Sequence, residues 1–223
     1  MNRNVKRISS RALAIALVAI MLCGSVIGGT VAWLIDQTDP VVNTFTFGDV
    51  NIDLEESDTG LDDDNDVDTN DYEMVPGETI IKDPRVTVFT DSKACWLYVK
   101  LEKSENFDDF MEYEMTKGWT QLKDVAGNDI EGVFYRPVDE VTGEDVVYEV
   151  IRDNEIYVKG SVTKEMLYAL GLEGGEVNYP TLTVTAYAVQ YSGFEPEISE
   201  GAVAPTAEQN NNAALRAWEQ IAG

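Results

Sequence analysis

The residues that could hold a metal ion lie in an acidic segment, residues 53–73, which contains eleven acids and no base. Within it, side chains with oxygen ligands recur at every second position, and a glutamate follows eleven positions after the first of them. This spacing is that of a calcium loop of the EF-hand type, whose ligands are all oxygens. The candidate calcium ligands are Asp62, Asp64, Asp66, Asp68, Asn70 and Glu73.

The same segment departs from a calcium loop in two respects. Its sixth position is Val67, where the sharp turn of such a loop needs glycine. The sequence also predicts no helices on either side of it. Three interpretations therefore stay open: a specific calcium site, a weak association of divalent cations with many carboxylates, or a solvated loop without a ligand.

Other routes to catalysis find little support. The chain of 223 residues contains no histidine, which excludes a Ser-His-Asp triad, a Cys-His pair and a histidine zinc site. Carboxylates are so numerous that no single pair stands out as acid and base. Cys95 shares one face of a predicted strand with apolar residues, so we expect a buried small side chain rather than a nucleophile. We predict that the protein is not an enzyme.

The charge of the chain is one-sided, with 41 acids against 16 bases and a net charge of −25. The first 32 residues hold four of the bases and no acid, so their removal would leave a net charge of −29. Such a body repels the phosphates of nucleic acids and anionic lipids, and we expect neither as a partner. The charge fits a surface exposed outside the cell, or one that attracts cations.

The first 32 residues have the organisation of an export signal. A basic stretch precedes a long apolar run, and the small residues Thr30 and Ala32 favour cleavage between Ala32 and Trp33. We therefore expect an N-terminal signal helix, and a signal peptidase as a partner during export. The alternatives are retention of residues 12–35 as a membrane-spanning helix and lipidation at Cys23. All three place the body outside the cytoplasm, either secreted or at the cell surface.

Behind this leader, apolar residues alternate with a period of two, which is typical of half-buried strands. Phe45 and Phe47 begin the pattern, and its parity changes at Gly48, where we expect a bulge or a tight bend. Further strands are expected over 50–55, 86–89, 95–101, 133–136, 146–150, 155–160 and 181–191.

Three short helices are expected among the strands. Asn106 and Thr163 each precede a short helical pattern as candidate N-caps, and Thr206 with Gln209 forms a candidate capping box near the C-terminus. Many short strands with scattered helices predict an all-β fold, namely an antiparallel β-sandwich.

Two stretches resemble a known family. The sequence GGTVAW at the end of the leader, followed by NTFTFGDVNIDL, is similar over about residues 24–54 to the start of the TasA/camelysin family. The stretch TLTVTAYAVQYSGF, residues 181–194, resembles the last core strand of these proteins. The family consists of proteins secreted by Gram-positive bacteria, whose signal peptide is cut by a dedicated signal peptidase of the SipW type. The resemblance implies a jelly-roll-like sandwich and assembly into biofilm-matrix fibres by donor-strand exchange, with the protein itself and related matrix proteins as partners.

This reading divides the chain into a signal peptide (1–32), an extended candidate donor segment (33–47), a β-sandwich domain (48–200) with an acidic loop (55–73), and a C-terminal helical tail (201–223). Self-assembly would use the apolar side chains of the donor segment as anchors. One alternative is a calcium-stabilised surface adhesin or a fibre-anchoring module. A secreted metallopeptidase, the activity described for camelysin, is disfavoured by the absence of histidine. The candidate anchors are Val41, Val42, Phe45 and Phe47.

Overall fold

The computed structural model describes residues 45–47, 49–57, 74–170 and 178–222. All of them belong to one compact unit, residues 40–223. Its strands are β1 (Phe45–Phe47), β2 (Ile52–Glu55), β3 (Thr79–Ile81), β4 (Arg85–Val88), β5 (Cys95–Lys103), β6 (Met111–Glu112), β7 (Thr120–Lys123), β8 (Asp129–Val138), β9 (Val146–Glu149), β10 (Glu155–Val158) and β11 (Leu182–Gln190). Its helices are α2 (Phe107–Phe110), α3 (Lys164–Leu170) and α4 (Ala207–Trp218), with a 3₁₀ turn, η1 (Arg152–Asn154).

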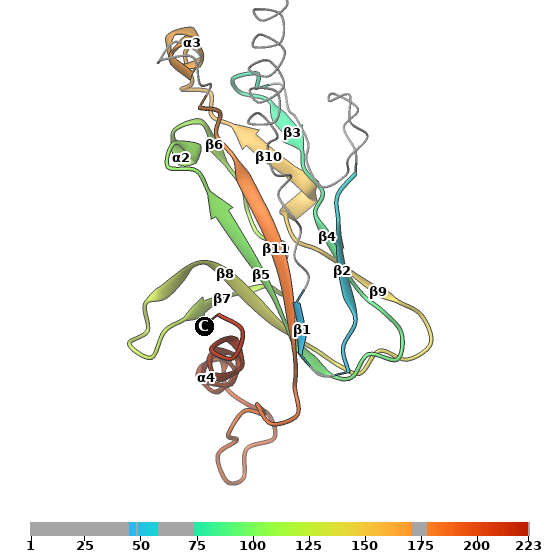
Figure 1. Ribbon diagram of the computed structural model, residues 1–223. Coiled ribbons are helices and arrows are strands. Elements are labelled where there is room, and N and C mark those ends of the chain that lie inside the picture. The colour runs from blue at the N-terminus through green and yellow to red at the C-terminus, as the bar shows by residue number, and fades with distance from the viewer. Residues whose placement is uncertain (1–44, 48, 58–73, 171–177, 223) are drawn as a thin grey trace, which may run out of the picture. The chain divides into compact units, whose positions relative to one another are not determined.

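The first layer is a five-stranded sheet in the order β1-β11-β5-β8-β7 (Figure 1). Strand β11 pairs with β5 along its whole length, from Leu182 opposite Lys103 to Gln190 opposite Cys95. These neighbours are antiparallel, as are the pairs β5–β8 and β8–β7. Strand β1 differs, because it lies parallel to β11 at one edge of the sheet.

The second layer consists of two three-stranded sheets, β2-β4-β9 and β3-β10-β6, both antiparallel. Strand β3 is followed by β4, and β9 is followed by β10, so the two sheets continue each other along the chain. Backbone hydrogen bonds cross the break: Lys82 N donates to Asn154 O at 2.9 Å, and Val150 N donates to Pro84 O at 3.1 Å. Backbone hydrogen bonds therefore join the two sheets of the second layer.

Apolar side chains of the two layers meet in the main core. Alternation along β5 directs Cys95, Leu97, Val99 and Leu101 into it, as the sequence predicts. The second layer contributes buried residues of β2, β4 and β10 to the same cluster. The predicted all-β antiparallel sandwich with a few short helices is confirmed. The expected signal helix lies outside the described residues.

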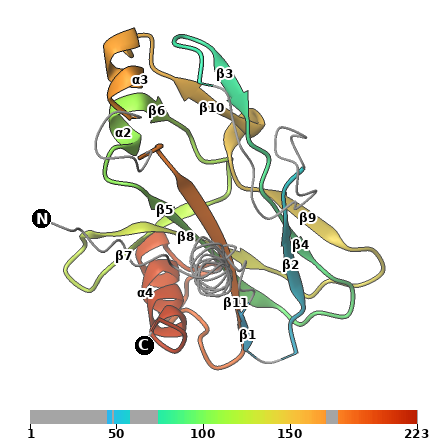
Figure 2. The ribbon, with the colours of Figure 1, turned by 45° about the horizontal axis from the view of Figure 1, so that its top comes forward.

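Helix α4 covers the other face of the five-stranded sheet (Figures 1 and 2). Its buried stripe includes Leu215 and Trp218, which pack with Trp96 and Tyr98 of β5. At its start, Thr206 and Gln209 form the predicted capping box. The segment expected as a C-terminal tail thus builds a second core, and β5 is buried on both faces.

Three local predictions have different outcomes. Thr163 caps α3, since its hydroxyl oxygen accepts from the Met166 amide at 3.2 Å. Asn106 occupies the predicted N-cap position of α2, but its side chain makes no capping hydrogen bond. Its side-chain amide donates instead to Asn178 O at 2.8 Å. The sequence also gave no indication of β3, β6 and β7, which are two to four residues long. Such short segments show too few alternations for a period to be recognised.

The change of parity near Gly48 corresponds to a passage between layers. Strand β1, before it, belongs to the five-stranded sheet, whereas β2, after it, belongs to the second layer. Gly48 itself lies outside the described residues. The chain therefore leaves the edge of one sheet and enters the other within a few residues.

Strand β8 contains an irregularity that only glycine accommodates. Its register with β7 shifts between Gln121 and Lys123, and the Gln121 amide donates to the carbonyl oxygens of Ile130 and Val133 at 2.7 and 2.9 Å. Gly132 lies between these two residues with φ +68°, and a Cβ there would lie 2.1 Å from the carbonyl oxygen of Leu101. A larger residue would clash with the backbone of β5 in addition to adopting a left-handed conformation.

We predict that Gly132→Ala lowers the free energy of unfolding by about 2–4 kcal/mol, because it combines left-handed strain with overpacking. The exposed Gly160, whose added Cβ would lie 3.6 Å from the Tyr157 hydroxyl, provides the control, and Gly160→Ala should change stability by less than about 0.5 kcal/mol. Urea unfolding followed by circular dichroism measures both. Equal stabilities of the two variants would contradict the role of Gly132.

Candidate functional site

The outer edge of β11 is the candidate surface for binding another chain. Strand β1 pairs with only three residues of β11, from Phe45 opposite Tyr187 to Phe47 opposite Val189. Residues 182–186 of β11 face no strand on this side among the described residues 45–47, 49–57, 74–170 and 178–222. A strand edge presents backbone N–H and C=O groups that require partners. Among the described residues, β1 therefore covers only part of this edge.

The chain is held firmly from Asp49 onward. The Asp49 carbonyl accepts from Lys93 N at 2.9 Å, and Asn51 N donates to the buried Ser92 hydroxyl at 3.0 Å. Val50, between them, is only 1% exposed. These contacts belong to the sandwich and do not involve β1. The pairing of β1 can thus change without loss of the anchor that follows it.

Helix α4 supports the strand that carries this edge. The ring of Tyr187, on β11, meets Trp218 edge-on, with the ring centroids 5.2 Å apart. Trp218 also packs on Tyr98, with the centroids 5.3 Å apart. Burial raises the pKa of Tyr98, so its hydroxyl stays protonated and donates to Ala214 O at 2.7 Å. Aromatic contacts and a buried hydrogen bond therefore connect β11, β5 and α4.

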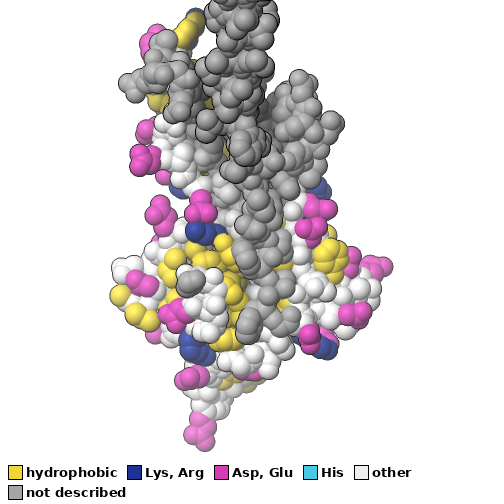
Figure 3. All heavy atoms as spheres, viewed as in Figure 1, with side chains coloured by type: hydrophobic (Ala, Val, Ile, Leu, Met, Phe, Trp, Pro, Cys, Tyr) yellow, Lys and Arg dark blue, Asp and Glu magenta, His cyan; other side chains and the backbone are white. Residues whose placement is uncertain are grey.

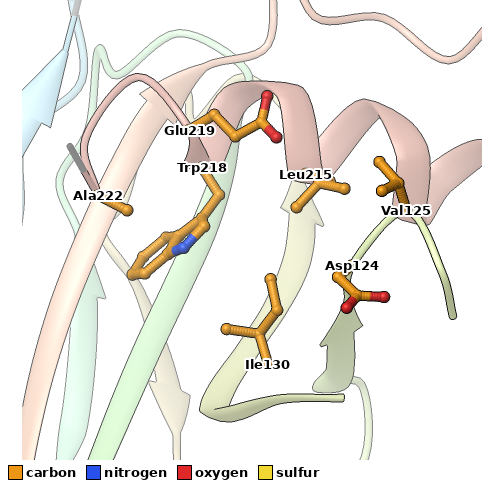
Figure 4. Close-up of a pocket in the computed structure, with 7 residues that line it drawn as sticks. All are labelled: Asp124, Val125, Ile130, Leu215, Trp218, Glu219 and Ala222. Atoms are coloured by element: carbon orange, nitrogen blue, oxygen red, sulfur yellow. The ribbon is translucent and has the colours of Figure 1, made fainter. Parts of the chain in front are cut away.

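A pocket of about 400 Å³ opens between α4 and the β7–β8 hairpin (Figure 4). Leu215 and Trp218 of α4 and Ile130 of β8 provide apolar walls, and Asp124 and Glu219 provide carboxylates. Figure 3 shows hydrophobic side chains exposed beside α4, among scattered charged ones. The Asp124 carboxylate is already occupied, since it accepts from the Asn128 side chain and backbone, which lowers its pKa. The pocket offers apolar contact rather than acid–base chemistry.

The first residues of the acidic segment belong to a polar cluster at the end of β2. Ser57 donates to Asp83 through both its amide and its hydroxyl, at 2.9 and 2.8 Å. Arg85 pairs with Asp83 at 3.1 Å, and Lys82 pairs with Glu56 at 2.8 Å. Every carboxylate of this cluster thus has a cationic or hydroxyl partner.

The predicted calcium site itself lies outside the described residues. Within the described ranges, no group of three or more histidine, cysteine, aspartate or glutamate side chains could hold a metal ion. The calcium prediction therefore stays a prediction. It concerns Asp62, Asp64, Asp66, Asp68 and Glu73.

The structure describes only some of the remaining candidate residues. Ala32 and Trp33, at the predicted cleavage site, and Val41 and Val42, in the candidate donor segment, lie outside the described residues. Phe45 and Phe47 mark the two ends of β1. In the part of the chain that the structure describes, no helix has the length and apolar character needed to cross a membrane.

No family model, no curated protein and no solved structure matches this chain. Evidence for a function therefore has to come from the sequence and from the geometry of the site. Sequence reasoning identified residues 181–191 as a strand, but it did not find that this strand lies next to a sheet edge. Tyr187 and Tyr191 of this segment pack against the second core. Their aromatic character indicated a packed strand, but not its position in the sheet.

Cys95 behaves as the sequence predicts. Its side chain is fully buried in the main core and forms no disulfide. Burial raises the pKa of its thiol from 9.0 to about 12. Because the thiolate is the reactive species, this cysteine is not suited to nucleophilic chemistry at neutral pH.

We predict that Cys95 in the folded protein without residues 1–32 resists iodoacetamide at pH 8 and reacts rapidly in denaturing urea. The raised pKa also has a consequence for stability. As the pH rises from about 9 to about 12, the unfolded chain loses a proton that the folded chain keeps, so the free energy of unfolding falls. Mass spectrometry of the alkylated protein tests the first expectation, and urea unfolding at several pH values tests the second. Alkylation at the same rate in both states would show that the thiol is accessible.

Proposed function

We propose that this chain is an exported structural protein of the extracellular matrix or cell surface, and that it assembles into fibres by donor-strand exchange. The observation that carries the proposal is the position of β1, a strand of three residues that lies parallel to β11 at the edge of the sheet. The resemblance of residues 24–54 to the TasA/camelysin family points to the same function. No catalytic role is proposed.

In the exchange, the donor segment of one copy replaces β1 of the next copy against β11. The register of β1 pairs residues 45–47 with residues 187–189. Continued toward the N-terminus, the same register brings residues 40–44 of the incoming segment opposite residues 182–186. The candidate anchors Val41 and Val42 then lie opposite Thr183 and Val184. Pro40 has no N–H group, so it is a natural first residue for this longer ladder.

The exchange replaces contacts within one chain by equivalent contacts between two chains. Its thermodynamic cost is therefore small, and protein concentration decides which form prevails. When each copy donates its segment to one neighbour and accepts that of another, the contact is head-to-tail, and a rotation that does not close produces open filaments. The sandwich holds its chain from Asp49 onward, which leaves residue 48 as the point where the donor segment departs.

We expect deletion of residues 33–43 from the secreted form to abolish filaments and to leave a folded monomer. The deletion removes the part of the donor segment that would pair with residues 182–186, while the sandwich and both cores are retained. Electron microscopy and analytical ultracentrifugation measure assembly, and circular dichroism checks the fold. A variant with residues 33–43 replaced by a glycine-serine sequence of equal length is the control for chain length. Filaments from the deleted protein would refute this mechanism.

A synthetic peptide of residues 33–47 should stop the growth of wild-type filaments, because it occupies β11 without offering a new acceptor edge. The matched control is the same peptide with Phe45→Asp and Phe47→Asp, which places charges where apolar anchors are expected. We expect the control peptide to inhibit at least about tenfold more weakly, since burial of an unpaired charge is costly. Equal inhibition by both peptides would show that these positions are not anchors.

Salt should promote assembly. A body with a net charge of −29 after removal of the leader repels its copies, and 0.15 M salt reduces the range of this repulsion to about 8 Å. Light scattering should show a lower critical concentration as sodium chloride increases, and magnesium and calcium should act similarly at equal ionic strength. A requirement for calcium alone, lost when Asp62, Asp64 and Asp66 are changed to asparagine, would instead favour the calcium-stabilised adhesin.

A further inference from the structure

Arg136 of β8 is a half-buried basic side chain without an ion pair among the described residues, whereas the half-buried Lys159 and Arg216, which also lack ion pairs, donate to backbone carbonyls. Within the described residues, seven lysine and arginine side chains form ion pairs with acids. Arg136 is in none of these pairs, and burial lowers the pKa of its guanidinium. In a chain with 41 acids and 16 bases, a half-buried arginine without an acidic partner requires an explanation.

Two aromatic rings hold the Arg136 guanidinium. Its central carbon, Cζ, lies 4.0 Å from the ring centroid of Tyr148 and 5.4 Å from that of Trp119. Trp119 is itself fixed, since its indole N–H donates to Glu149 O at 2.9 Å. Gly118 completes the cradle: a Cβ there would lie 3.1 Å from a terminal nitrogen of the guanidinium. The side chain is therefore held in place before any ligand arrives.

This environment suits the binding of a carboxylate. Stacking on aromatic faces uses the faces of the guanidinium and leaves its in-plane N–H donors for a ligand. The Arg136 Nε atom and the Thr116 hydroxyl are both buried and have no hydrogen-bond partner, so solvent does not reach these two atoms. The planar fork of guanidinium donors matches the two oxygens of a carboxylate, and charge-assisted hydrogen bonds are strong where solvent is partly excluded.

We propose that Arg136 binds a carboxylate side chain of an acidic protein segment, which residues 58–73 of a second copy supply. That segment contains eight acids and no base, so its charge complements a cation that no acid of its own body neutralises. The assignment to a second copy rests on the proposed fibre. The site itself does not, because β5 and β11 separate β8 from the edge that accepts the donor segment.

The test is a titration of the secreted protein, at concentrations too low for assembly, with a synthetic peptide of residues 58–73. Calorimetry gives the affinity, and the NMR signal of the Arg136 side-chain N–H reports the contact directly. We expect Arg136→Met, which keeps the packing volume, to weaken binding at least about tenfold. Arg136→Lys keeps the charge without the planar fork, so its affinity should fall between the two. A peptide with every acid changed to its amide should not bind.

Lys117→Met is the matched control. This exposed lysine directly precedes Gly118, so the variant removes one positive charge near the site and leaves Arg136 intact. It should change the affinity by less than about twofold, as expected for a screened surface charge. Thermal unfolding of each variant verifies the fold, and Arg136→Lys keeps the test valid if Arg136→Met unfolds.

Three results would overturn the inference in whole or in part. Unchanged binding by Arg136→Met, or equal losses in Arg136→Met and Lys117→Met, would show general charge attraction rather than a site. Binding of free acetate with the same affinity would exclude the segment as the specific ligand. If Arg136→Met binds the peptide weakly but forms fibres at the wild-type critical concentration, a second copy is not the source. Loss of fibres in the deletion of residues 33–43 is a separate result and tests only the donor mechanism.

Discussion

Strand β11 has two unequal sides, and its backbone groups must be satisfied on both. On one side it pairs with β5 through nine residues, and on the other with β1 through three. An exposed strand edge is a template for pairing with any extended chain, and proteins usually cover or shorten such edges. Here the cover is a short parallel strand that immediately precedes the first anchored residue, Asp49. In the proposed exchange, an equivalent segment of another copy meets the same backbone requirement that places β1 in its own sheet.

Such a replacement requires a sheet that keeps its shape when an edge strand leaves. The two cores provide this rigidity, because residues of β5 and β11 alternate between the main core and the core under α4. Ala186 and Ala188 of β11 contact the main core, while Val189 contacts the second core. The strand is thus fixed by packing on both faces, independently of β1. Trp218 contributes to the same support through its contacts with Tyr98 and Tyr187.

The sequence predicted those features of the fold that local patterns determine. Alternation along residues 95–101 assigned each side chain of β5 to the correct face, and the capping box of Thr206 identified the start of α4. The tertiary role of α4 did not follow from its pattern, since an apolar stripe shows that a helix packs but not what it packs against. The Asn106 side chain bonds to Asn178, a residue 72 positions away, and a contact of this kind has no local signal.

The candidate sites also combine features that local patterns predict with features that depend on the tertiary fold. Period-two alternation predicted that residues 45–47 form a strand, but the parallel register with β11 depends on where the chain turns between the layers. Arg136 gave no signal in the sequence, because its alternating position in β8 resembles that of any polar residue on a strand. Its environment arises from Trp119 and Tyr148, which come from different parts of the chain. Only the folded arrangement shows that this arginine lies against two aromatic rings and has no ion pair among the described residues.

Charge decides which kinds of contact between copies can be favourable. Ion pairs on the surface contribute about 0–1 kcal/mol each, and 16 bases cannot neutralise 41 acids. Two copies that approach through their general surfaces therefore repel each other. A backbone ladder forms the same hydrogen bonds at any net charge, and apolar anchors gain from burial regardless of it. For a body of this composition, strand exchange is attractive without opposite charges. In the proposed contact at Arg136, the acids of the partner bind a positive charge, so they favour association.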